Sequence, residues 1–155
     1  MRLRLLAVGT RMPDWVSRGV EEYRKRLPRD FTLDIEEIVP GQRGKNAGMT
    51  RATALEAERI RGRLKGGERL VALEVGGKAW STEQLAREAE TWRQEGRDVV
   101  LLVGGPDGLE PSLSASADQR WSLSPLTLPH PLVRILLAEQ LYRAWTLLVG
   151  HPYHR

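Results

Sequence analysis

The chain has no cysteine among its 155 residues and only three histidines. The first absence excludes a thiolate nucleophile, a disulfide framework and a cysteine-ligated zinc site. Because a metal site needs three or four ligands, so few histidines also predict that no metal is bound. Long apolar runs are missing too, since no stretch approaches the ~18 residues that cross a membrane. We therefore expect neither a metal centre nor a membrane anchor.

Export signals and common phosphate-binding motifs are also absent. The opening MRLRLLAV alternates arginine with leucine, so it lacks the apolar core of a signal peptide. Neither the P-loop pattern GxxxxGK[ST] nor the dinucleotide pattern GxGxxG occurs. We expect a cytoplasmic protein that does not hydrolyse nucleotides.

The composition is that of a folded chain with a basic bias. It is 41% hydrophobic and 28% charged, and its length suits one domain over residues 1–155. Residues 1–70 carry 16 basic against 10 acidic side chains, and arginine makes up 20 of the 24 basic residues in the chain. Arginine is suited to bidentate phosphate contacts, so nucleic acid is a candidate partner. Genome composition and solvated helix faces explain the same bias equally well.

Apolar patterning predicts alternating strands and helices. We expect strands at residues 3–8, 31–39, 69–74, 98–103 and 121–123, and helices at 13–26, 47–64, 81–95, 111–117 and 131–149. A turn is expected at Gly76-Gly77, and Ser81 with Gln84 predicts a capping box. Strands separated by helices indicate a three-layer α/β fold with a mostly parallel sheet.

Two loops stand out as candidate ligand sites. The glycine loop (residues 104–108, GGPDG) follows the most apolar strand, at the edge of the sheet where ligands of open α/β folds bind. An ordinary tight turn is the alternative there. Residues 123–131 hold three prolines among leucines, which predicts a rigid, buried loop rather than a central strand. The backbone groups of a buried loop need partners, and a bound ligand is one such partner.

Other charged segments have simpler interpretations. The helix carboxylates, Glu56 and Glu88 among them, are expected on solvated faces, and His130 is expected to be structural. Arg43 and Lys45 belong to a basic loop that we expect to contact RNA. The end of the chain, HPYHR, is either a frayed terminus or a functional tail.

The last predicted helix is apolar around too much of its circumference to pack against one sheet. Its apolar side chains recur on more than one face: Leu132, Val133, Ile135, Leu136, Leu137, Leu141, Leu147 and Leu148. The extra face predicts a second subunit, most economically across a two-fold axis.

Six ordered motifs carry a resemblance that spans the whole chain. They are LAVGTRMPDWV (6–16), GQRGKNA (41–47), GGPDGL (104–109), LTLPHPLVR (126–134), EQLYRAW (139–145) and HPYHR (151–155). Together they resemble a family of ribosomal RNA methyltransferases in the SPOUT superfamily. Relatives usually have glutamate where this chain has Asp107, and a residue with a backbone N–H where it has Pro125.

The resemblance implies a fold and a cofactor. The fold would be a SPOUT α/β fold with a C-terminal trefoil knot, in which the leucine loop (residues 123–128) threads beneath the glycine loop. The pocket would hold S-adenosylmethionine, and its expected contacts are Leu73, Gly104, Gly105, Leu123, Ser124, Pro125, Leu126, Thr127 and Leu128. Since proline has no N–H, Pro125 cannot donate a backbone hydrogen bond.

The resemblance also implies a reaction and its partners. A homodimer would methylate N3 of a pseudouridine in helix 69 of 23S rRNA, on the assembled ribosome. Direct transfer needs no protein nucleophile, but the imide must lose its proton. We expect Tyr153 or His154 to act as the base, with Arg155 orienting the RNA. The alternative is a non-enzymatic ribosome-binding protein with a vestigial cofactor pocket, which calorimetry with S-adenosylmethionine would distinguish.

Overall fold

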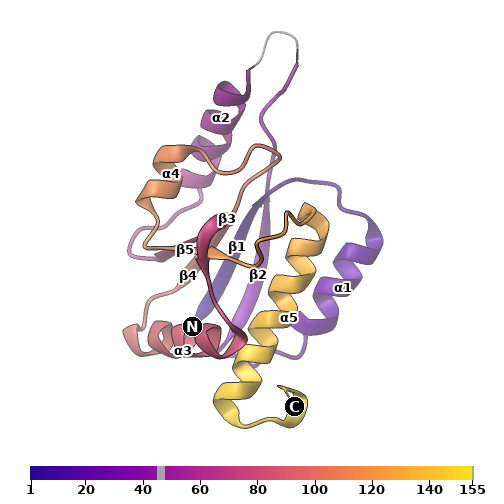
Figure 1. The fold of residues 1–155 in the computed structure, drawn as a ribbon, viewed down its shortest axis with the longest axis vertical. Coiled ribbons are helices and arrows are strands. Elements are labelled where there is room, and N and C mark those ends of the chain that lie inside the picture. Colours follow the sequence, from indigo (N-terminus) through magenta and orange to yellow (C-terminus); the bar gives the residue numbers. More distant parts are fainter. Residues whose placement is uncertain (45–47, 155) are drawn as a thin grey trace.

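All five strands run parallel in one sheet. This computed structural model describes residues 1–44 and 48–154. The strands are β1 (Arg2–Val8), β2 (Thr32–Ile38), β3 (Arg69–Ala79), β4 (Val99–Val103) and β5 (Gln119–Ser122), in the order β2-β1-β4-β3-β5. Each pairs in parallel with its neighbours (Figure 1).

Helices cover both faces of the sheet. They are α1 (Asp14–Arg24), α2 (Met49–Arg61), α3 (Thr82–Glu95), α4 (Pro111–Ser116) and α5 (His130–Val149), followed by a 3₁₀ turn, η1 (Pro152–His154). Buried side chains of α1, α3 and α5 pack on one face, and those of α2 and α4 pack on the other. The expected three-layer α/β class is therefore confirmed.

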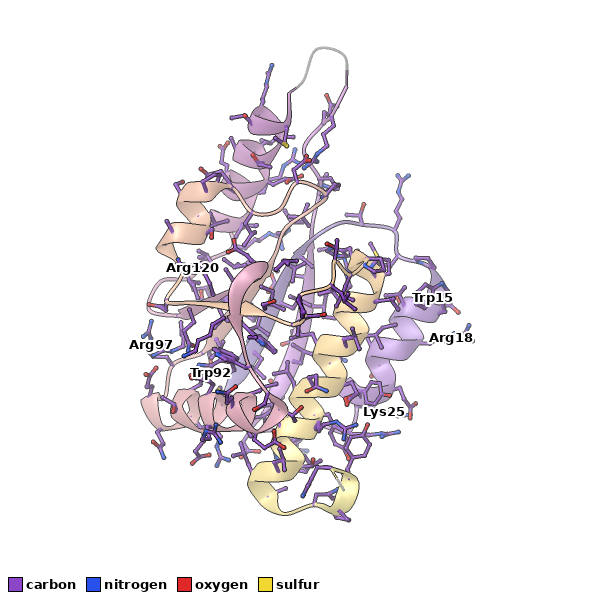
Figure 2. All side chains as sticks on the ribbon, in the orientation of Figure 1. Trp15, Arg18, Lys25, Trp92, Arg97 and Arg120 are labelled. Carbon is purple, nitrogen blue, oxygen red and sulfur yellow. The ribbon has the colours of Figure 1, made fainter. Side chains whose placement is uncertain are left out.

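Side-chain alternation explains how one strand serves two cores. In β1, Leu3 and Leu5 belong to the core beneath α1, α3 and α5, whereas Leu6 and Val8 face the core beneath α2 and α4. Every residue of β4 is apolar and buried, because this central strand is covered on both faces. Trp92 of α3 points toward the sheet (Figure 2) and its Nε1 donates to Gln119 Oε1 at 2.9 Å.

The long helix α5 spans the molecule. Its 20 residues extend about 30 Å, and Figure 1 shows the chain terminus beyond its far end. It packs beside α1, where a Cβ on Gly19 would lie only 2.8 Å from Ile135 Cδ1. The two ends of α5 are consequently far apart, which separates the residues at its start from the tail.

The prediction of a turn at Gly76-Gly77 is wrong, because β3 continues to Ala79. Leu73 and Lys78 both pair with Trp121, so the intervening residues form a bulge in the β3–β5 ladder. A Cβ on Gly77 would lie 2.8 Å from the Trp121 backbone, which shows why glycine is needed there.

Most other boundaries agree with the sequence analysis. The capping box is confirmed: Ser81 Oγ accepts from Gln84 N at 3.1 Å, and Ser81 N donates to Gln84 Oε1 at 2.8 Å. The helix expected at residues 47–64 runs from Met49 to Arg61.

The bulge predicts a contrast between adjacent glycines. Gly77→Ala should lower the free energy of unfolding by roughly 1–3 kcal/mol, because its methyl group overlaps the Trp121 backbone. Gly76→Ala is the matched control, since nothing lies within 4 Å of its Cβ. Urea denaturation of the two variants tests this, and equal stabilities would contradict the close approach.

Candidate functional site

A cavity of about 1140 Å³ lies at the carboxyl edge of the sheet. Residues at or beyond the carboxyl end of β1, β2, β4 and β5 line it, together with the β3 bulge and the start of α5. Of the expected cofactor contacts, the cavity wall contains Leu73, Gly104, Gly105, Leu123, Ser124, Leu126, Thr127 and Leu128. Pro125 is exposed and does not line the cavity.

The glycine loop is a tight turn that also forms cavity wall. Gly108 N donates to Gly105 O at 3.0 Å, and Gly108 has a left-handed φ of 77°. A Cβ on Gly104 would lie 2.4 Å from the Gly108 carbonyl carbon, so the turn itself requires that glycine. The loop can therefore be both a tight turn and part of a ligand site, the two interpretations that the sequence offered.

Gly105 faces protein as well as the cavity. A Cβ there would lie 3.1 Å from Val8 Cγ1, 3.5 Å from Glu56 Oε2 and 3.7 Å from Arg43 Nη2. A bulky residue at this position would disturb those neighbours even with the cavity empty. A substitution of Gly105 is thus a poor test of ligand binding.

The leucine loop is less buried than its sequence suggests. Leu126 is 69% exposed, and Pro125 and Thr127 are exposed too, so the expectation of a wholly buried loop is wrong. The loop is held locally, because Ser122 Oγ donates to Ser124 O at 3.0 Å and Leu126 N donates to Ser124 Oγ at 2.9 Å.

His130 joins a network that links α5 to the end of β2 and to the loop after β1. Its Nε2 accepts from Arg134 Nε at 3.0 Å. Arg134 also donates to Glu37 Oε2 at 2.8 Å and to Gly9 O at 3.0 Å. Arg134 is buried, and an Nε2 that accepts a hydrogen bond belongs to a neutral imidazole. This geometry supports the structural role expected for His130.

The surroundings lower the pKa of His130. Burial is the main cause, with repulsion from Arg134 second, and a hydrogen bond to the Gly104 backbone and the charge of Glu37 oppose them. The folded protein therefore favours the neutral ring, which keeps the Arg134 hydrogen bond in place.

Arg43 lies between two carboxylates instead of facing solvent. It donates from Nε to Asp107 Oδ2 at 2.6 Å and from Nη1 to Glu56 Oε2 at 2.8 Å. Glu56 is 3% exposed and also accepts from Gly41 N at 2.9 Å. The expected solvated Glu56 is wrong, and the guanidinium of Arg43 is engaged within the protein. Lys45 lies outside the described residues.

The tail lies far from the cavity of its own chain. Tyr153 and His154 follow the end of α5, about 30 Å along the helix from the cavity-lining His130. Figure 1 shows the start of α5 and the turn η1 at opposite ends of this helix. The third expected catalytic residue, Arg155, lies outside the described residues.

The tail folds back onto α5 and is not frayed. The ring of Tyr153 lies 4.7 Å from that of Tyr142, and the Arg143 guanidinium lies 4.9 Å from the Tyr153 ring centre. Partial burial raises the pKa of Tyr153 above its usual value, helped by the nearby charge of Glu139, so the phenol stays protonated at neutral pH in this arrangement. Nδ1 of His154 is buried and has no hydrogen-bond partner among the described residues.

Comparison with known proteins identifies the family. The family described as "Predicted SPOUT methyltransferase" matches residues 1–154. Proteins called ribosomal RNA large subunit methyltransferase H are similar over 155 residues and 100% of both chains: 68% identical in Chromohalobacter salexigens, 61% in Azotobacter vinelandii and 60% in Pseudomonas putida W619. The chain belongs to the SPOUT methyltransferase family.

A solved structure has a similar fold at low sequence identity. A probable methylase family protein from Haemophilus influenzae Rd KW20 aligns with a TM-score of 0.56 and 10% identity, over 99% of this chain and 70% of that one. At this identity the likeness concerns the fold alone.

The sequence analysis missed two of the charged groups that organise this SPOUT site. Glu56 lies four residues from both Ala52 and Ile60, on the buried face of α2. Arg134 similarly shares the buried face of α5 with Ala138 and Leu141. A charged residue within an apolar helical stripe was therefore the available signal, because it predicts a buried partner.

The His130 network predicts a pH dependence. Since the pKa of His130 is lowered on folding, its contribution to stability is present above the unfolded value of 6.5 and is lost as the pH falls through it. The free energy of unfolding should therefore fall less steeply from about pH 7.5 to about pH 5.5 in His130→Gln than in the unsubstituted protein. Denaturation at several pH values tests this, and parallel profiles would contradict a neutral, buried His130.

Proposed function

We propose that this chain transfers a methyl group from S-adenosylmethionine to N3 of a pseudouridine in helix 69 of 23S rRNA, on the assembled ribosome. Full-length relatives called ribosomal RNA large subunit methyltransferase H support the rRNA methyltransferase activity. The observation that carries the proposal is the cavity at the carboxyl edge, whose wall includes both the glycine loop and the leucine loop. The particular nucleotide follows from the resemblance of the six motifs.

The cavity residues fit S-adenosylmethionine. Leu73, Leu123 and Leu128 offer an apolar wall for an adenine ring. The backbone N–H groups of Thr127 and Leu128 have no hydrogen-bond partner among the described residues, so they are available to polar atoms of the ligand. The cavity volume of about 1140 Å³ is slightly larger than the ~300–1000 Å³ typical of ligand sites, which leaves room for a nucleobase beside the cofactor.

The proposed mechanism is direct transfer. S-adenosylmethionine supplies an activated methyl group on its sulfonium. The glycine and leucine loops would hold the cofactor, and the cavity wall would orient its methyl group toward the target nitrogen. The imide proton must leave N3, and His154 is the favoured acceptor because the raised pKa of Tyr153 keeps its phenol protonated.

A tail that acts in catalysis must serve the cavity of a second copy. Two α5 helices packed antiparallel across a two-fold axis would bring the tail of each subunit toward the cavity of the other. Leu132 and Leu136 are each 41% exposed at the start of α5, and Trp15 of the adjacent α1 is 48% exposed (Figure 2). These apolar side chains support a homodimer that uses this surface.

The remaining expectations stay proposals. They are a knot formed by the leucine loop, one domain over residues 1–155, and a cytoplasmic location. In residues 1–44 and 48–154, no helix is long and apolar enough to span a membrane, and no cluster of potential metal ligands occurs.

The RNA surface is proposed to include α2. A hollow of about 700 Å³ shares Arg43 with the cavity and is also lined by Arg51 and Arg59. Arg59 is held in place by hydrogen bonds to Val39 O at 2.7 Å and Pro40 O at 3.1 Å. Exposed Arg51 therefore replaces Arg43 as the side chain that we expect to meet an RNA phosphate.

The deciding experiment maps the methyl group. Ribosomes from cells that lack this protein are incubated with the purified protein and isotopically labelled S-adenosylmethionine, and helix 69 is analysed by mass spectrometry. The proposal predicts label on N3 of one pseudouridine. Ribosome binding without labelling would favour the non-enzymatic alternative.

Mixed dimers test whether the tail acts across subunits. Thr127→Trp blocks the cavity, and truncation after Gly150 removes the tail, so either homodimer should lose at least ~10²-fold in methyl transfer. A dimer with one subunit of each kind contains one complete site, and its activity should return to about half of the normal rate. Methyl transfer should be measured on doubly tagged dimers. Mixed dimers as inactive as the parents would contradict the arrangement.

The salt dependence of ribosome binding tests the role of Arg51. Arg51→Ala should reduce the slope of log affinity against log salt by about 0.7–0.9, the change expected for one phosphate contact. Arg87→Ala, an exposed arginine of α3, is the matched control and should leave the slope unchanged. Calorimetry should give the same S-adenosylmethionine affinity for all three proteins. If the salt slopes of Arg51→Ala and Arg87→Ala are equal, Arg51 does not contact an RNA phosphate.

A further inference from the structure

An ion pair joins the two loops that follow β2 and β4. Arg43 belongs to the β2 loop and Asp107 to the glycine loop, and their Nε and Oδ2 atoms lie 2.6 Å apart. Both loops line the cavity, the β2 loop through Pro40, Gly41 and Arg43 and the glycine loop through Gly104 to Pro106. The position of one loop against the other therefore determines the shape of the cavity between them.

Hydrogen bonds to Glu56 and Gly41 also hold the guanidinium of Arg43 in place. Its Nη1 donates to Glu56 Oε2 at 2.8 Å and to Gly41 O at 3.1 Å, and its Nη2 donates to Glu56 Oε1 at 3.2 Å. Glu56 is anchored in α2, and a Cβ on Gly41 would lie 2.4 Å from Ala52 O, so this loop is pressed against the helix. The guanidinium is thus held by Glu56 and Gly41, and its Nε–H donates to Asp107.

The charge of Arg43 is permanent in this setting. Its hydrogen bonds to Glu56 and Asp107 raise the pKa of the guanidinium further above its usual range. Arg43 therefore offers a permanent positive charge to Asp107.

Asp107 contributes little to the folding of its own loop. The turn is closed by the Gly108 N to Gly105 O hydrogen bond and by the close packing of Gly104 on Gly108. Among the described residues, the only hydrogen bond to the Asp107 side chain comes from Arg43. Removing its charge should leave the turn folded and free the loop from Arg43.

We propose that Arg43 is a positioning residue: through its ion pair with Asp107, it holds the glycine loop in the place that S-adenosylmethionine requires. This inference rests on the proposed function for the identity of the ligand. The Arg43–Asp107 pair, hereafter the latch, contacts the loop and not the reacting atoms.

Calorimetry with S-adenosylmethionine tests the latch. Asp107→Asn and Arg43→Lys should each raise the Kd about five-fold, the size expected for a partly exposed ion pair. The double variant should bind no more weakly than the weaker single variant, because both changes break one interaction. Asp107→Glu keeps the charge and should bind nearly normally. At saturating cofactor, kcat should be retained while KM for S-adenosylmethionine rises.

A second ion pair serves as the matched control. Glu95→Gln removes the partner of Arg69 at a site that does not line the cavity, so it should leave the Kd unchanged. Thermal melting of every variant shows whether the protein is folded at the temperature of the titration.

A measurement without cofactor separates this inference from the proposed function. Hydrogen exchange at Gly108 N, which donates to Gly105 O, should be faster in Asp107→Asn than in Glu95→Gln if the latch steadies the loop. The positioning role of the latch would be overturned by any of three results. They are unchanged exchange at Gly108 N in Asp107→Asn, an unchanged Kd for S-adenosylmethionine in the single variants, and additive effects on the Kd in the double variant. Failure of the unsubstituted protein to bind S-adenosylmethionine would instead overturn the proposed function, and exchange would still decide the positioning role.

Discussion

Parallel pairing of all five strands brings their carboxyl ends to one edge of the sheet. Loops that are far apart in the chain, such as residues 9–12 and 123–128, meet there and surround one cavity. The bulge in β3 adds to this effect, because it directs residues 74–76 to the same cavity. The site is therefore a consequence of strand direction, and the helices matter chiefly for how they hold the loops.

Two buried charged groups hold those loops against one another. Arg134, at the start of α5, joins Gly9, Glu37 and His130. Glu56, in α2, holds Arg43, which reaches the glycine loop. Each network links residues that are far apart in the chain, and each buried charge is paired, as burial requires. These hydrogen bonds fix the positions of the loops that line the cavity.

Local patterning could predict most of the secondary structure, because alternation, capping residues and glycines act over a few positions. It also located the glycine and leucine loops at the cavity. It could not predict that β3 continues through Gly76-Gly77, since this depends on the Trp121 backbone of a distant strand. The pairing of Arg43 with Glu56 and Asp107 likewise depends on contacts across 13 and 64 positions. The resemblance to the family depended on six sequence motifs taken together, and hydrophobic periodicity alone could not have indicated it.

The central claim is that the carboxyl-edge cavity binds S-adenosylmethionine between the glycine and leucine loops. A crystal structure of the protein grown with S-adenosylmethionine tests this most directly. The account predicts the adenine against Leu73, Leu123 and Leu128, with the backbone N–H groups of the leucine loop donating to the ligand. Ligand density at any other surface, with the cavity empty, would contradict it.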